Sequence, residues 1–297
     1  MPSQEAMPPP APKRARPKRV NTVGEWSAMN GEAKLPAVFA GLREMYGERR
    51  WRAHAEPIDE LVLTILSQRN TDRSTEQAYL TLRERFPTWE QVMLAPVEEI
   101  ADAIHYAGLY LMKAPRIQAV LRQVIEERGN FDLRFLSELP LEEARAWLLA
   151  LPGVGPKTTA IVLLFSLGRP AFPVDTHVYR VTQRVGLIGP KATEASAHIT
   201  LEAMIREASE HGTLPATPQA AMFEMHINLI GHGRKLCHAI SPECSRCKLL
   251  PICPFGQHRI APHDETHEAQ SVAPTNANRA RKSSTTKTTN PQEAVPE

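Results

Sequence analysis

The stretch that decides the fold reads Leu151-Pro152-Gly153-Val154-Gly155-Pro156-Lys157-Thr158. An amphipathic helix with acidic residues in its first turn is expected just before it, over residues 141–150. Glycines can adopt positive φ angles, so we expect the chain to reverse tightly at Gly153 and Gly155 and to leave backbone N–H groups bare. Pro156 suits the first position of a second helix. The stretch therefore predicts two helices joined by a glycine hairpin.

The hairpin is also a candidate DNA contact. Bare amides at the start of a helix form a site for a phosphate oxygen, and such a contact holds a nucleic-acid backbone without reading its sequence. Gly153 and Gly155 are therefore candidate DNA-binding residues. The alternative is a plain glycine turn between packed helices, which the motif alone leaves open.

Between its two ends the chain reads as a series of helices. Apolar residues recur at helical or continuously buried spacing, and no long stretch alternates as a half-buried strand does. Proline or glycine marks many of the joints. The segments are residues 35–46, 58–67, 73–85, 89–95, 97–106, 113–128, 141–150, 157–167, 176–186, 193–208 and 219–231. We therefore expect an all-α fold.

Two residues after the turn carry the candidate chemistry. Lys157 lies in the first turn of the second helix, where the helix dipole and partial burial favour a neutral amine. Such an amine can attack C1′ of a deoxyribose and form a Schiff base, although a solvated lysine is the ordinary alternative. Asp175, in the motif P-V-D-T-H, can stabilise an oxocarbenium-like centre or simply cap the next helix. His177 of the same motif is a candidate DNA contact or a packed histidine.

All cysteines of the chain lie in one C-terminal stretch with the spacing C-x6-C-x2-C-x5-C: Cys237, Cys244, Cys247 and Cys253. Without a secretory signal, a metal site is favoured over a disulfide framework. Structural zinc usually takes two C-x2-4-C pairs, and here there is one. Four thiolates in a compact loop can instead hold an iron–sulfur cubane. The spacing favours the cluster and leaves zinc open.

Composition limits the partners and the location. The formal net charge of the 297 residues is +2, so any DNA affinity must come from locally clustered charge. No apolar run approaches the roughly 20 residues that span a membrane, so we expect an intracellular protein. Residues 1–32, rich in proline and base, and residues 258–297 are predicted to be disordered. The first could be a solubilising arm, a non-specific DNA tether or, in a eukaryotic source, a nuclear-import signal.

Taken together, these motifs resemble those of the endonuclease III family of DNA glycosylase/AP lyases, in the helix-hairpin-helix glycosylase superfamily. The resemblance covers roughly residues 33–257. It implies two helical lobes flanking a DNA cleft: a six-helix barrel over 50–169, and an iron–sulfur cluster domain from 33–49 and 170–257. It also implies a monomer that excises oxidised pyrimidines from double-stranded DNA and cleaves abasic sites.

The resemblance assigns roles to single residues. Lys157 would be the Schiff-base nucleophile, Asp175 the catalytic carboxylate, and the four cysteines the ligands of a [4Fe–4S] cluster. Leu109 would be the apolar wedge that enters the opposite strand. The family fills the gap left by the flipped base with a glutamine. Here the motif places Arg69 at that position and Gln68 one place earlier, so both are candidates.

Two other functions compete with this interpretation. The adenine glycosylases of the same superfamily lack the lysine and need a glutamate in the helix over 58–67, where this chain has Ile65. They also carry a large C-terminal recognition domain. The second alternative is a non-enzymatic DNA-binding module with a structural metal. Borohydride trapping on abasic-site DNA separates these alternatives, because only a Schiff-base enzyme becomes covalently attached.

Overall fold

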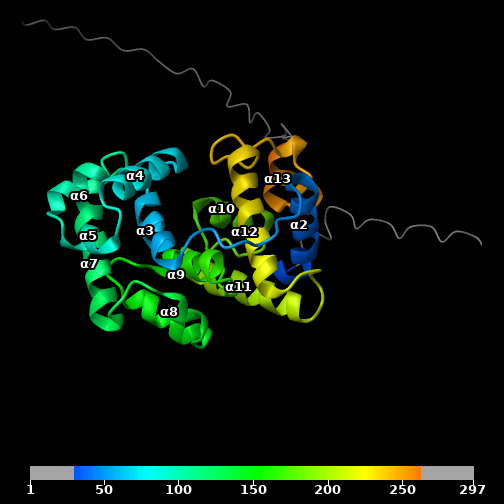
Figure 1. The fold of residues 1–297 in the computed structure, drawn as a ribbon. Coiled ribbons are helices and arrows are strands. Elements are labelled where there is room, and N and C mark those ends of the chain that lie inside the picture. Colours follow the sequence, from blue (N-terminus) through cyan, green and yellow to red (C-terminus); the bar gives the residue numbers. More distant parts are fainter. Residues whose placement is uncertain (1–29, 262–297) are drawn as a thin grey trace, which may run out of the picture. The chain divides into compact units, whose positions relative to one another are not determined.

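The computed structural model describes residues 30–261 (Figure 1). The expectation of an all-α fold is confirmed, because these residues form helices and turns without a strand. The predicted disordered arm and tail lie outside the described residues, except at their inner ends. Helix α2 (Gly31–Tyr46) and helix α13 (Pro254–Ile260) include residues 31–32 and 258–260, so disorder was wrong there.

The first of two hydrophobic cores lies within residues 58–171. Helix α3 runs through it and packs against α4, α7 and α9. Its Leu61 and Ile65 are fully buried, and burying one such side chain is worth about 1.5–3 kcal/mol. The elements around this core are α3 (Pro57–Ser67), α4 (Asp72–Arg85), α5 (Trp89–Leu94), α6 (Val97–Ala103), α7 (Tyr110–Arg128), the 3-10 turn η1 (Arg134–Ser137), α8 (Leu141–Ala150) and α9 (Pro156–Ile161).

The second core combines the N-terminal helix with the C-terminal part of the chain. Its buried residues come from 35–42 and from 164–252. Helix α12 is at its centre and contacts α2, α10 and α11. The elements after the first core are α10 (Thr176–Val185), α11 (Glu194–Glu210), α12 (Pro218–Lys235), the 3-10 turns η3 (Cys244–Arg246) and η4 (Leu250–Ile252), and α13.

The chain passes from the first core to the second through a π-helix, η2 (Val162–Ser166), which continues α9. Leu163 belongs to the first core and its neighbour Leu164 to the second. The prediction of one α-helix over 157–167 is wrong after Ile161, where the backbone changes from an α-helix to a π-helix. The Leu167 amide donates to the carbonyl of Val162, five residues earlier, as in a π-helix. The segment after α2 crosses beside it, where Trp51 donates to the Leu164 carbonyl at 2.6 Å.

Several helix boundaries differ from the sequence prediction by a few residues, and one short helix was not predicted; two of these differences have a local physical reason. Helix α7 begins at Tyr110 rather than at residue 113, because Leu111 and Met112 in its first turn are exposed and break the buried pattern. Helix α13 was not predicted. It is short, and its N-cap is the Cys253 sulfur, which accepts from the Gly256 amide, rather than a Ser, Thr, Asp or Asn side chain. Among the described residues, no helix is both long and apolar enough to cross a membrane.

Candidate active site

Helices α8 and α9 are joined by the predicted hairpin, but its two glycines differ. Gly153 has φ +70°, and a Cβ added there would lie 2.5 Å from Arg116 Nε. Gly155 is the N-cap of α9 with φ −107°, so the expectation of positive φ at both glycines was wrong for Gly155. A Cβ on Gly155 would meet nothing within 4 Å. Gly153 is therefore required by the turn, whereas Gly155 leaves open space in front of the helix.

Lys157 and Asp175 line the same cleft, which has a volume of about 780 Å³. Both side chains are half-buried. The charges of both residues act on buried His226. Burial lowers the pKa of His226 to about 4; the carboxylate of Asp175 opposes this shift, and the amine of Lys157 adds to it. The structure thus brings together the two candidate catalytic residues, which lie 18 positions apart in the sequence.

Asp175 is the N-cap of α10, so the predicted capping role is confirmed. Its Oδ1 accepts from the Val178 amide at 2.7 Å. The other carboxylate oxygen has no hydrogen bond within the described residues, so the capping role leaves it available to the cleft. Capping and a charge-stabilising role are therefore compatible in this geometry.

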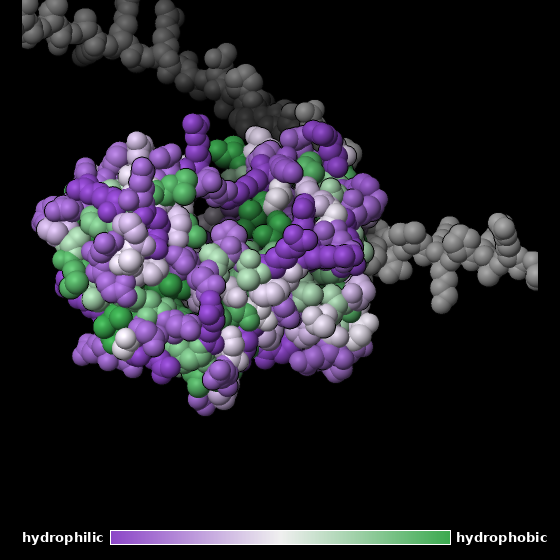
Figure 2. Space-filling view, viewed as in Figure 1, coloured by the Kyte–Doolittle hydropathy of each residue, from purple (hydrophilic) through white to green (hydrophobic). Residues whose placement is uncertain are grey.

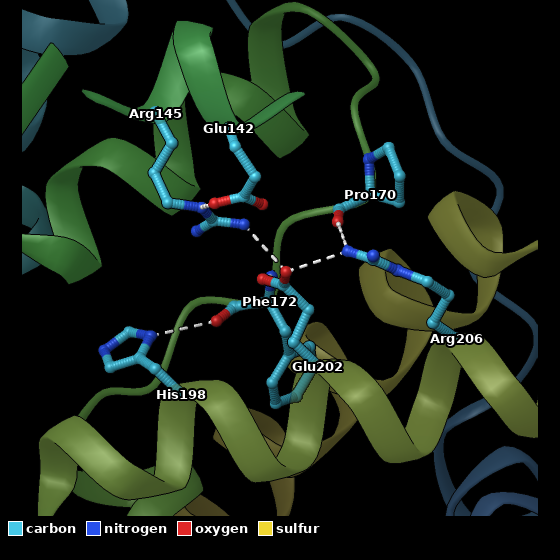
Figure 3. A network of polar contacts seen from close by, with 7 residues as sticks. All are labelled: Glu142, Arg145, Pro170, Phe172, His198, Glu202 and Arg206. Atoms are coloured by element: carbon cyan, nitrogen blue, oxygen red, sulfur yellow. Dashed lines mark hydrogen bonds and ion pairs between the residues drawn. The ribbon is translucent and has the colours of Figure 1, made fainter. Parts of the chain in front are cut away.

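Side chains rather than a sheet hold the extended segment before Asp175. The Phe172 amide donates to Glu202 Oε2 at 2.9 Å, and the Phe172 carbonyl accepts from His198 Nδ1 at 3.0 Å (Figure 3). The Pro173 carbonyl accepts from His226 Nδ1 at 2.9 Å. These bonds satisfy three polar backbone groups of a buried segment and so help to fix its path.

The cleft is lined by residues from helices that pack on each of the two hydrophobic cores. In Figure 2, the surface is hollowed between α4 and α12, and both hydrophilic and hydrophobic side chains border the hollow. Asp72 of α4 and Arg234 of α12 form an ion pair across it, with oxygen–nitrogen distances of 2.7 and 3.2 Å. The lining residues are Thr64, Ser67, Gln68, Arg69, Asn70, Asp72, Gly153, Gly155, Pro156, Lys157, Thr158, Val174, Asp175, Thr176, His177, Glu194, Ala195, His198 and Arg234.

The two candidate gap-filling residues have different surroundings. The Gln68 side chain accepts from Arg116 at 3.1 Å, and its carbonyl accepts from buried Lys113 at 2.8 Å. Arg69 is exposed to the cleft with φ +53° and has no side-chain hydrogen bond or ion pair in the described residues. Arg69 is therefore the side chain that is free to move, whereas Gln68 is tethered to α7.

Leu109, the candidate wedge, lies beside this loop rather than in the cleft lining. It precedes α7 with φ +63°, and 48% of its surface is exposed. A Cβ on the neighbouring Gly108 would lie 3.4 Å from the Arg69 carbonyl, so the two loops approach closely. Helix α7 thus begins directly after this candidate wedge and carries Lys113, which also donates to the Leu66 carbonyl at 2.7 Å.

Two histidines line the cleft, and one of them was not singled out from the sequence. His177 accepts from Arg180 at 3.1 Å, and burial lowers its pKa. His198 lies on α11, and its pKa is also lowered, chiefly by burial and further by nearby Arg145 and Lys157. His198, Arg234 and Glu202 were missed because no local motif marks them. Only the tertiary packing brings them to the site.

The four cysteines line one small cavity, together with residues of α10 and α12. Their sulfurs form no disulfide. Arg184 donates to Cys237 Sγ at 3.3 Å, and His232 Nε2 lies 3.6 Å from Cys247 Sγ. Among residues 30–261, no three His, Cys, Asp or Glu donors converge closely enough to hold a single metal ion. The four cysteines thus border one cavity, which is the part of their predicted role that the structure describes.

Comparison with known proteins first gives the class. Residues 62–207 match the model of the HhH-GPD superfamily of base excision DNA repair proteins. A solved structure of a non-covalent endonuclease III–DNA complex aligns with a TM-score of 0.64 at 28% identity, covering 78% of this chain and 99% of that one. The class is thus a base-excision DNA repair enzyme with a helix-hairpin-helix.

Curated relatives then give the family. Endonuclease III of Bacillus subtilis is 34% identical over 206 residues, which cover 69% of this chain and 84% of that protein. Endonuclease III of Thermotoga maritima is 32% identical over 210 residues, with 70% and 88% covered. A relative from Arabidopsis thaliana, 32% identical over 191 residues, is matched over 58% of its length. The chain belongs to the endonuclease III family of DNA glycosylase/AP lyases.

Proposed function

We propose that this enzyme removes oxidised pyrimidines from double-stranded DNA, as a monomer, and cleaves the resulting abasic site through a Schiff base on Lys157. The observation that carries the proposal is the shared cleft, in which the amine of Lys157 and the carboxylate of Asp175 open to the same space. A flipped nucleotide entering this cleft would meet a nucleophile and an anion together.

The two residues can divide the chemistry as follows. The Lys157 amine attacks C1′, the bond from C1′ to the base nitrogen breaks, and the base leaves with the bonding electrons. Asp175 stabilises the positive charge that develops on the sugar and can take up a proton from the attacking amine. The sugar ring opens to a Schiff base, and loss of a C2′ proton expels the 3′ phosphate. Water then hydrolyses the Schiff base and frees Lys157.

We also propose that Cys237, Cys244, Cys247 and Cys253 hold a [4Fe–4S] cluster. Burial, together with the neighbouring thiolates, raises the pKa of Cys253 to about 11, so this thiol ionises near neutral pH only beside strong positive charge. A bound metal group supplies that charge. All four cysteines line one cavity, and four thiolates are the ligands that such a cluster takes. When bound, the group would fix the loop after α12.

Borohydride trapping on a duplex with one abasic site tests the Schiff base. The wild-type chain should become covalently attached to DNA, whereas Lys157→Gln should not, while still binding the same duplex. Lys191→Gln is the matched control, because Lys191 is an exposed lysine outside the cleft lining. Trapping of the Lys157→Gln variant at the wild-type level would remove Lys157 from the nucleophile role.

The substrate class needs a separate experiment. Single-turnover excision should be measured on matched duplexes with an oxidised pyrimidine, with adenine opposite an oxidised purine, and with no lesion. We expect excision of the oxidised pyrimidine. Excision of the adenine instead would contradict the proposed substrate while leaving the lyase chemistry untouched.

Metal analysis tests the cluster. The purified chain should be yellow-brown, absorb at roughly 400 nm and contain about four iron atoms, as one [4Fe–4S] cluster requires. Stoichiometric zinc without visible absorbance would contradict the assignment and favour a structural zinc site.

A further inference from the structure

One carboxylate connects the helix before the hairpin to the segment before Asp175. Glu202 of α11 is largely buried, with 12% of its side chain exposed. Its Oε1 accepts from Arg145 of α8 at 2.7 Å, and its Oε2 accepts from the Phe172 amide at 2.9 Å. The two oxygens therefore reach in different directions, one to each part of the site (Figure 3).

Each end of this connection lies close in sequence to a candidate catalytic residue. Arg145 is on α8, which runs directly into the hairpin and the first turn of α9, where Lys157 is placed. Phe172 is three residues before Asp175, in a segment without regular structure of its own. Because α8 packs on the first core and α11 on the second, the bond from Arg145 to Glu202 also spans the two cores.

Glu202 is the centre of a wider network of polar contacts. Arg206 donates to Glu202 Oε1 at 2.9 Å, so two guanidinium groups share one oxygen. Charge-assisted hydrogen bonds of this kind are short and directional, and here they are partly shielded from solvent. By contrast, Glu142 contacts only the outer side of Arg145, at 3.2 Å, and 74% of its side chain is exposed.

We propose that Glu202 is a positioning residue that sets the placement of Asp175 relative to Lys157. It acts by holding the Phe172 amide and Arg145 at once, so the hairpin and the Asp175 segment cannot move independently. This inference rests on the proposed roles of Lys157 and Asp175. Reactions between positioned groups are sensitive to displacements of about 1 Å, so loss of the connection should lower the rate more than the affinity for DNA.

The test compares Glu202→Gln with Glu142→Gln, two isosteric changes on the same arginine. Glutamine at 202 keeps the size but places an NH2 donor against either Arg145 or the Phe172 amide. We expect Glu202→Gln to lower the single-turnover rate of base excision roughly 10- to 100-fold, with the dissociation constant for an uncleavable abasic-site duplex within about twofold of wild type. Glu142→Gln should keep the wild-type rate.

A double-mutant cycle separates positioning from general destabilisation. Arg145→Gln breaks the same connection from the other side, so it should give a similar loss, and adding Glu202→Gln should cause little further loss. If Glu202→Gln does not fold, the excision rate of Arg145→Gln is compared with that of Glu142→Gln instead, because Arg145 is more exposed than Glu202 and its replacement disturbs the fold less.

Three results would overturn the proposal: a wild-type rate in the Glu202 and Arg145 variants, a loss confined to DNA affinity, or an equal loss in Glu142→Gln. Failure of the proposed function looks different. In that case the wild-type chain itself would not be trapped by borohydride on abasic-site DNA, whatever the behaviour of Glu202.

Discussion

The two hairpin glycines should respond differently to the same substitution. In Gly153→Ala, the left-handed conformation costs about 1–2 kcal/mol. The new Cβ would also lie 2.5 Å from Arg116 Nε and displace the guanidinium that donates to Gln68, a loss of about 1–2 kcal/mol. Together these come to roughly 2–4 kcal/mol, or a Tm lower by roughly 4–16 °C for a chain of this size.

Gly155→Ala should leave the fold intact and weaken DNA binding. Alanine fits φ −107° without strain and its Cβ meets nothing within 4 Å, so the Tm should stay within about 1 °C of wild type. The methyl group would fill the space through which a phosphate approaches the bare amides. Loss of hydrogen bonds to that charged group, worth about 1.5–3 kcal/mol, predicts a dissociation constant roughly 10- to 150-fold higher.

Calorimetry for the Tm and fluorescence anisotropy with an uncleavable abasic-site duplex measure the two effects separately. Unchanged affinity in Gly155→Ala would refute the phosphate contact at this position and leave the hairpin as a plain turn. Equal loss of Tm in both variants would refute the conformational difference between the two glycines.

Three further predictions concern the other candidate residues. Asp175→Asn keeps an N-cap but removes the charge, so the single-turnover rate of excision should fall by orders of magnitude while the circular dichroism spectrum stays unchanged. A matching loss of helix would indicate a purely structural role for Asp175. Arg69→Ala should slow excision of a damaged base far more than cleavage at a pre-formed abasic site; if Gln68→Ala shows that selectivity instead, Gln68 is the residue that fills the gap. Cys244→Ser should reduce iron content and solubility before it affects borohydride trapping, since its cavity is separate from the cleft; trapping lost with iron retained would contradict this.

The helices and the hairpin could be predicted because their signals are local. Helix α8 has the predicted bounds, and Asp175 caps α10 as its sequence position suggested. The cleft residues that could be named from the sequence, such as Lys157, all lie in short motifs with a recognisable spacing. Local sequence patterns were therefore enough to predict both the fold class and the candidate nucleophile.

The supporting contacts could not be predicted, because their partners are far apart in the sequence. Glu202 meets the Phe172 amide 30 residues away, and Arg234 meets Asp72 across 162 residues. Neither pair has a sequence spacing that marks it, since each depends on how helices of the two cores pack. The π-helix after Ile161 was missed for a related reason: a continuous apolar run predicts burial but not the backbone hydrogen-bond pattern.

The positive φ angles of Arg69 and Leu109 have a consequence for engineering this enzyme. They are the non-glycine residues with such angles in the described part of the chain, and each conformation costs about 1 kcal/mol or more that a glycine would not incur. A screen for heat resistance would therefore favour glycine at both positions. The same screen would discard two side chains that are candidate DNA contacts. Selection for thermal stability and selection for repair activity should therefore favour different residues in these loops.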